Sequence, residues 1–283
     1  MDEFMRKGNR AALFFLIAGV IFLLLGSLLG AGFSYMVESP YWKWGRLFDW
    51  GTAKEESFEF SPAQLTRLKI EMGNGQVHIV ESEGSQVVVR LRQKREEIVV
   101  GQDKDLLEIK MISKEFWNNS DSKVTLELPK GIRFEQISIE NESGKTEIET
   151  TVMSNQAVIS VGEGMLHAKS LVAGSFYGQV GAGEMNLEET VTDTIEAVCE
   201  TGNLVFRGEI HTRARIECDS GTVKLELGGT ARDYNYKLRC GNGSIRIGEA
   251  EFHWNEKLQK ISNGSEKSLR LECQTGKISA DFN

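Results

Sequence analysis

The sequence contains an internal repeat, and every copy is centred on one glycine. Copies such as LKIEMGNGQVHIV, AVISVGEGMLHAK and ARIECDSGTVKLE align on that glycine without gaps. From the second copy onward the glycines follow at steps of 20, 19, 19, 19, 22 and 33 residues. One such short unit cannot bury an apolar face alone, so the period predicts a stack of structural repeats. The eight repeat glycines are Gly75, Gly144, Gly164, Gly183, Gly202, Gly221, Gly243 and Gly276.

The residues that flank each glycine alternate between apolar and polar. After Gly202, for example, Leu204 and Phe206 are separated by a single residue. Alternation of this kind is typical of strands with one buried face. Each copy therefore reads as strand, x-x-G turn, strand, and we expect the glycine to supply a positive φ in the turn. The predicted fold is an all-β β-solenoid of roughly 19–22-residue coils, with strands about 4.8 Å apart.

All cysteines fall in one column of the repeat, three residues before the glycine. An antiparallel sandwich also has short strands at regular spacing, but it has no reason to keep one residue type in one column. In-register neighbours about 4.8 Å apart are too distant for a disulfide, whose Cβ atoms are about 3.5–4.5 Å apart. The column has neither a C-x-x-C pair nor a histidine, so we expect no metal site. The predicted buried thiol column is Cys199, Cys218, Cys240 and Cys273.

The repeat is regular in the C-terminal part of the chain and not in the part before it. Residues 136–283 are expected to form the solenoid, with an insertion at 249–268 that could be a binding loop or a solvated one. The alternating stretches VVVRLR and KVTLELP lie in 57–135, where no period links them. This N-terminal β region is expected to be an antiparallel cap or a set of irregular opening coils.

The N-terminal part of the chain has the pattern of a membrane anchor. No charged residue occurs from 11 to 37, which is long enough for a transmembrane helix. Arg6, Lys7 and Arg10 predict that residues 1–10 are cytoplasmic and that the C-terminal domain is extracytoplasmic at the cell membrane. Residues 38–56 would be an aromatic juxtamembrane linker. Cleavage of the segment as a signal peptide is the alternative.

Two small residues in the predicted span have the G-x-x-x-G spacing. Gly26 and Gly30 would let two helices approach closely, which makes them a candidate helix–helix contact for a weak homo-oligomer. Glycine is also common in membrane helices without such a role.

Motifs for catalysis or cofactor binding are absent from the sequence. It has no G-x-S-x-G, Walker or H-E-x-x-H pattern, so no catalytic, cofactor-binding or metal-binding residue is predicted. With 33 basic and 41 acidic residues the formal net charge is −8, which argues against a nucleic-acid partner. His78 and His167 have the same outward-facing position in the repeat and could share a face.

The sequence resembles the bacterial putative adhesin domain family in four features. These are the apolar N-terminal segment, the LKIEMGNGQVHIV opening, the KVTLELP strand before ISIENESGKTEI and the serial x-x-G coils. The resemblance covers about 57–283. It implies an anchored or secreted β-solenoid with a role at the cell envelope, and it brings no catalytic residue with it.

The expected function is therefore that of a membrane-anchored, non-enzymatic, adhesin-like protein. Its mechanism would be the presentation of a long, rigid, acidic face to an envelope protein or cell-wall polymer. The alternative is a membrane-tethered regulatory partner in envelope-stress signalling, which would act through the span. A polysaccharide-active enzyme is the least favoured of the three, because no pair of carboxylates stands out in the sequence.

Overall fold

The structure is a computed structural model that describes residues 53–93, 98–112 and 122–283, with only the course of the strand given for 253–257. The predicted cytoplasmic N-terminus, transmembrane helix 11–37 and its Gly26 and Gly30 lie outside the described residues, as do residues 38–52 of the linker. Within the described part of the chain, no helix has the length and apolarity needed to cross a membrane.

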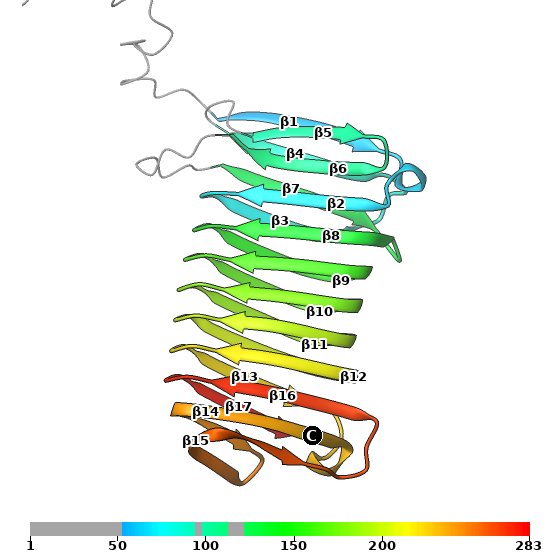
Figure 1. Cartoon of the computed structure of the whole chain (residues 1–283). Helices are drawn as coiled ribbons and strands as arrows, with labels where there is room; N and C mark the ends of the chain where they lie inside the picture. Colours follow the sequence, from blue (N-terminus) through cyan, green and yellow to red (C-terminus); the bar gives the residue numbers. More distant parts are fainter. Residues whose placement is uncertain (1–52, 94–97, 113–121) are drawn as a thin grey trace, which may run out of the picture. The chain divides into compact units, whose positions relative to one another are not determined.

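The centre of the described unit is a stack of parallel coils (Figure 1). Each long strand begins after one x-x-G turn, ends at the next, and pairs in parallel with the strand of the following coil. The pairing keeps the repeat in register, so Val180 lies beside Cys199, and Cys199 beside Cys218. The all-β class and the β-solenoid are thus confirmed. The strands are β8 (Arg133–Asn141), β9 (Lys145–Val161), β10 (Met165–Val180), β11 (Glu184–Cys199) and β12 (Asn203–Cys218).

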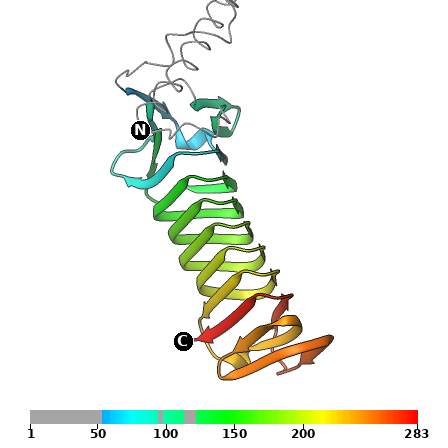
Figure 2. The same cartoon turned by 90° about the vertical axis from the view of Figure 1, so that its left-hand side faces the viewer.

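Each long strand bends midway and contributes to two sheets that face each other across the core (Figure 2). The bends coincide with shifts in register, for example between Leu187 and Thr190. They use unusual backbone, with φ of 44° at Glu189 and 154° at Gly208. We call the sheet that enters each x-x-G turn the pre-turn sheet and the one that leaves it the post-turn sheet.

The core lies between these two sheets. Buried and partly exposed residues alternate along the strands, as the sequence predicts. In one coil, Leu204 and Phe206 of the post-turn sheet and Ala214 and Ile216 of the pre-turn sheet are all buried, and they belong to one continuous apolar cluster. Stacking the coils therefore removes a continuous apolar surface from water, which is the main stabilising term.

The N-terminal region 57–135 combines both expected forms. The pair β2–β3 is a regular coil that stacks directly on β8 and β9, so the solenoid begins well before residue 136. The pair β6–β7 lies on its outer side in parallel, and β1, β4 and β5 add antiparallel strands there. The elements are β1 (Lys54–Phe60), a 3₁₀ turn at Pro62–Gln64, β2 (Arg67–Met72), β3 (Gln76–Ser82), β4 (Val87–Gln93), β5 (Ile98–Asp103), β6 (Leu106–Met111) and β7 (Lys123–Pro129).

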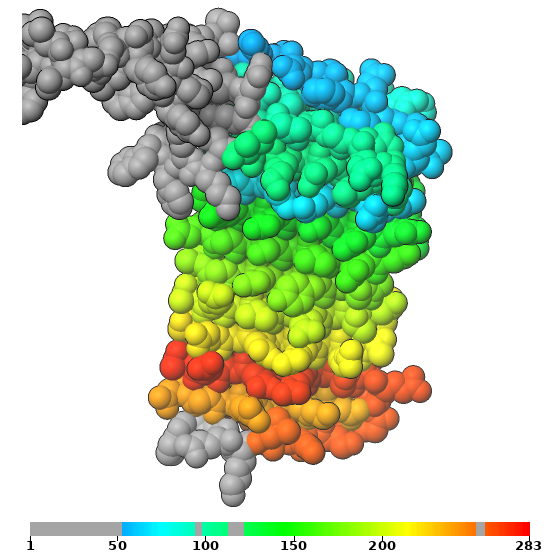
Figure 3. All heavy atoms as spheres, turned by 45° about the horizontal axis from the view of Figure 1, so that its top comes forward, coloured from blue at the N-terminus to red at the C-terminus, as the bar shows by residue number. Residues whose placement is uncertain are grey.

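The C-terminal coil is not the end of the stack. The pair β16–β17 lies between β12–β13 and β14, which Figures 1 and 3 show as a red band between yellow and orange. The insertion 249–268 is largely a strand, β15, that runs antiparallel to β14 and covers the end, so its interpretation as a loop is wrong. The elements are β13 (Thr222–Leu227), a 3₁₀ turn at Ala231–Asp233, β14 (Tyr234–Ile247), β15 (Ala250–Ile261), β16 (Lys267–Cys273) and β17 (Lys277–Phe282).

The repeat glycines are required for a different reason from the one the sequence suggested. Of the eight, only Gly75 has a positive φ. A Cβ atom on any of the other seven would lie 2.2–2.4 Å from the carbonyl oxygen of the repeat glycine in the coil beneath, for example Gly183 above Gly164. The turns stack so closely that only a residue without a side chain fits. The need is steric contact between coils rather than a left-handed backbone.

We expect Gly183→Ala to lower the free energy of unfolding by about 2 kcal/mol or more, because the added methyl group must push two coils apart. Urea unfolding followed by circular dichroism measures this change. Gly101→Ala is the matched control, since a Cβ at Gly101 in β5 meets no atom within 4 Å. Equal unfolding midpoints for the two variants would contradict the steric explanation.

Candidate functional site

The structure stacks the four cysteines in one column. In-register pairing joins Cys199 to Cys218, Cys218 to Cys273, and Cys273 to Cys240. The spatial order thus differs from the sequence order, because β16 lies between β12 and β14. All four are buried and none forms a disulfide.

The column position closes the x-x-G turn by a hydrogen bond. The thiol of Cys199 donates to the carbonyl oxygen of Gly202 at 3.2 Å, and that of Cys218 donates to Gly221 at 3.3 Å. Asn141 occupies the same position in its coil, where its amide donates to the Gly144 oxygen at 3.0 Å and accepts from the Gly144 nitrogen at 2.8 Å. A small donor in this column therefore holds the turn.

The hydrogen bonds between these thiols shift their pKa values in different directions, and the bond with Cys218 lowers the pKa of Cys199. The hydrogen bond with the Cys199 thiol, together with burial, raises the pKa of Cys218 to about 11. The hydrogen bond with Cys218, together with burial, raises the pKa of Cys273 as well. Reactive cysteines need access to solvent as well as a thiolate, and all four cysteines of this column are buried. Its role is structural.

An open groove of about 530 Å³ lies at the edge where the coils turn. It is lined by the repeat glycines Gly75, Gly144, Gly164 and Gly183, among other residues. Its walls are mostly backbone and short polar side chains. Several hydroxyls on this edge already bond to the coil beneath, such as that of Ser143 to the Gly73 oxygen at 2.9 Å. The groove is the seam between stacked turns.

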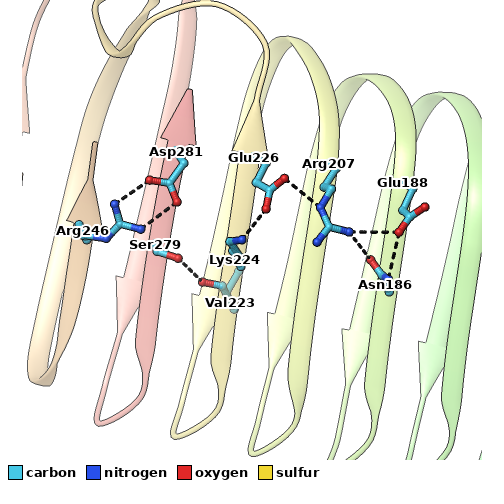
Figure 4. A network of polar contacts seen from close by, with 9 residues as sticks. All are labelled: Asn186, Glu188, Arg207, Val223, Lys224, Glu226, Arg246, Ser279 and Asp281. Carbon is cyan, nitrogen blue, oxygen red and sulfur yellow. Dashed lines mark hydrogen bonds and ion pairs between the residues drawn. The ribbon is translucent and has the colours of Figure 1, made fainter. Parts of the chain in front are cut away.

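The outer surface of the post-turn sheet carries ion pairs that connect successive coils (Figure 4). Arg207 on β12 lies between Glu188 on β11, at 3.1 Å, and Glu226 on β13, at 2.8 Å. At the end of the stack, Arg246 on β14 pairs with Asp281 on β17 through two contacts of 2.6 and 2.8 Å. Cations on this surface thus pair with carboxylates on neighbouring coils, although Glu226 and Asp281 also lie opposite each other.

Two histidines lie nearer to each other than their sequence numbers suggest. His78 and His167 flank Glu147 in adjacent coils, because β3 pairs directly with β9. Nε2 of His78 lies 3.0 Å from Glu149, and Nε2 of His167 lies 3.5 Å from Glu188. No group of three or more potential ligands able to hold a metal ion occurs among the described residues.

The outer surface of the pre-turn sheet has a hollow near the C-terminal end. It has a volume of about 300 Å³ and crosses β11, β12, β16 and β14. Sequence reasoning could not find it, because its central strand β16 comes from a segment 50 residues after β12. The polar lining comprises Thr194, Glu196, Arg213, Arg215, Lys237, Ser268 and Arg270.

We expect the four cysteines to resist a thiol reagent in the native protein, since all are buried. After denaturation without reductant, close to four thiols per chain should react. The native protein treated with the reagent for the same time is the control. Two or fewer reactive thiols in denaturant would mean that a disulfide forms in this column.

The Arg246–Asp281 pair predicts a pH dependence of stability. The hydrogen bond from Arg246 lowers the pKa of Asp281 below its usual value. The pair therefore stabilises the native state above the unfolded-state pKa of about 4, and this contribution is lost as the pH falls through the lower native pKa. Asp281→Asn should be less stable than the wild type at neutral pH, and the difference should disappear towards a pH of about 2.

Urea midpoints at several pH values measure this difference. The matched control is Asp103→Asn, because Asp103 is exposed and forms no ion pair with a described residue. A stability difference between wild type and Asp281→Asn that stays constant from neutral to acid pH would contradict the interpretation.

Comparison with known proteins finds a match to one family model. Residues 65–192 match the family model described as Toastrack DUF4097. No curated protein matches the chain. A putative cell adhesion protein from Clostridium sporogenes is 15% identical, with 82% of this chain and 100% of that chain covered and a TM-score of 0.38.

Two further crystal structures are similar at the same level. A putative adhesin from Bacteroides fragilis is 11% identical, with 80% of this chain and 97% of that one covered and a TM-score of 0.47. A putative lipid binding protein from Parabacteroides distasonis is 15% identical, with 81% and 97% covered and a TM-score of 0.47. The family match covers the strands from β2 into β11, and it agrees with the resemblance to the putative adhesin domain family that the coils indicate.

Proposed function

We propose that this chain is a non-enzymatic, adhesin-like protein of the cell envelope whose solenoid presents a rigid surface to a binding partner. The observation that carries the proposal is the in-register pairing of successive coils. Because of this register, every outward side chain has a neighbour one strand spacing away, about 4.8 Å, on the next coil. Such a surface displays rows of side chains and suits an extended partner.

The surface is held rigid by contacts on both sides of each coil. Turn backbones bond from coil to coil, as in the 2.9 Å bond from the Glu142 nitrogen to the Met72 oxygen. Ion pairs such as Glu188–Arg207–Glu226 connect three coils on the post-turn sheet. A partner that binds to such a surface does not need to order it, which lowers the entropic cost of binding.

The charges of the outer surface favour recognition over glycan hydrolysis. A glycosidase needs a carboxylic acid whose pKa is raised so that it can donate a proton near neutral pH. Among the described residues, every carboxylate with a shifted pKa is shifted downward by neighbouring cations or hydrogen bonds. These are Glu71, Asp105, Glu147, Glu226 and Asp281.

The proposal includes the anchor that the sequence predicts. Residues 11–37 would cross the membrane, and residues 53–283, which form a compact unit, would stand on its outer side. The match of residues 65–192 to the Toastrack DUF4097 family model and the resemblance to adhesin domains support this assignment.

Site-specific photo-cross-linking of the full chain in cells tests the function. A cross-linkable residue replaces Tyr177, which is outward on the pre-turn sheet, or Lys224, which is outward on the post-turn sheet. Adducts with envelope protein or cell-wall polymer are expected from at least one of these positions. The matched control places the same residue at Phe206, which is fully buried in the core and should give no adduct to another molecule.

Cross-linking within 11–37 separates the proposal from the regulatory alternative. Adducts that form only there, and never from the solenoid, would contradict the proposal and favour a protein that acts through its span.

A further inference from the structure

Four cations lie side by side on the outer surface of the pre-turn sheet. In-register pairing joins Arg215 to Arg270, Arg270 to Lys237, and Lys237 to Lys260. We call these four residues the cationic row. Neighbouring strands are about 4.8 Å apart, so the row extends for roughly 14 Å along the stack. Glu196 on β11 precedes it in the same line.

The row lies in a local excess of positive charge. Arg213 and Arg239 flank it on the same surface, two residues away along their strands. Three carboxylates face these six cations: Glu196 and Glu217 contact Arg215, and Glu272 contacts Arg270 and Arg239. Among the described side chains the local balance is therefore positive by three charges. By contrast, residues 51–283 contain 28 basic and 37 acidic residues.

This arrangement differs from the one around Arg207 on the post-turn sheet. There, Arg207 lies between two carboxylates on neighbouring coils. In the cationic row each cation lies opposite at least one other cation, and like charges directly opposite each other on paired strands destabilise a sheet. Lys237 and Lys260 are exposed and form no ion pair with any described residue. An anion bound along the row would relieve this repulsion.

The surface is also hollowed where the row lies. The cavity of about 300 Å³ has Arg215, Arg270 and Lys237 in its lining. Guanidinium groups bind tetrahedral and planar anions through several N–H donors, and lysine binds phosphate as a point charge. The hollow thus offers both the shape and the charge for a chain of anionic groups.

We propose that the cationic row binds a linear polymer that carries phosphate groups, with the polymer chain lying along the stack. The proposal rests on the proposed function and names the ligand class of its pre-turn surface. A flat anionic membrane fits less well, because Glu217 and Glu272 lie opposite each other in the adjacent row and would face its head groups. A ligand one chain wide meets the cations and avoids the carboxylates.

The proposed ligand class differs from the expectation that a long, rigid, acidic face binds the partner. The acidic excess of the chain would keep polyanions away from most of its surface, and the cationic row would be the place where they bind. The strands that form the row are out of sequence order, so no linear motif in the sequence predicts the cationic row.

Binding of fluorescent long-chain inorganic polyphosphate to the full chain, purified in a non-ionic detergent, tests this proposal. We expect saturable binding that weakens with added salt, because exposed charges are screened. The double variant Lys237→Gln, Lys260→Gln should bind at least about fivefold more weakly, since two unpaired cations are removed. The matched control is Lys130→Gln, Lys169→Gln, which removes two exposed lysines elsewhere and should bind as the wild type does.

Competition distinguishes the sources of phosphate. Orthophosphate at the same phosphate concentration should compete poorly, because it occupies one position of the row at a time. The second competitor is mixed micelles of the detergent with phosphatidylglycerol. If these compete more strongly than unlabelled polyphosphate does, the proposal is overturned in favour of a lipid head-group surface. Equal competition by polygalacturonate at matched charge would overturn the preference for phosphate.

The outcomes also separate this inference from the proposed function. Equal polyphosphate affinity of the two double variants would overturn the cationic row as the site, even where photo-cross-linking from Tyr177 or Lys224 still captures envelope material. Loss of those adducts in a chain that retains polyphosphate binding would instead contradict the envelope function.

Discussion

The close approach of successive turns is the constraint on which the rest of the structure depends. The repeat glycines stack so that a Cβ atom on one would lie 2.2–2.4 Å from the carbonyl oxygen of the one beneath it. This contact keeps the coils in register, and the register brings like positions of different coils together. The buried thiol column, the apolar core and the outward rows of charges all follow from it. A change that separates two turns would therefore disturb the core and both outer surfaces at once.

The ends of the stack show how the chain closes a solenoid without leaving a regular coil exposed. At the N-terminal end β6 and β7 lie outside β2 and β3, and at the C-terminal end β14 lies outside β16 and β17. In both places an antiparallel strand covers the outermost coil, β5 on β6 and β15 on β14. The outermost coils are thus formed by internal segments of the sequence. Capping units of this kind shield a stack whose last apolar face would otherwise be open.

The two outer surfaces use the same register for different purposes. On the post-turn sheet, Arg207 pairs with carboxylates on the two neighbouring coils and connects three coils of the stack. On the pre-turn sheet, four cations are neighbours and repel one another. This cluster of positive charge stands out because the chain as a whole is acidic. The difference between a stabilising ladder and a binding surface therefore lies in which residue follows which in space.

The sequence by itself determined the all-β class, the strand–turn–strand unit, the apolar core positions and the cysteine column, because these depend on alternation and on a period that is visible within each copy. Val223 and Leu225, for example, are identified as core residues by their distance from Gly221 alone. Only the tertiary structure decided the order of the coils, since pairing partners such as Cys218 and Cys273 are chosen by backbone fit at the end of the stack. The same order decided that Arg215 lies beside Arg270, that His78 and His167 flank Glu147, and that the repeat glycines are needed for steric contact between coils.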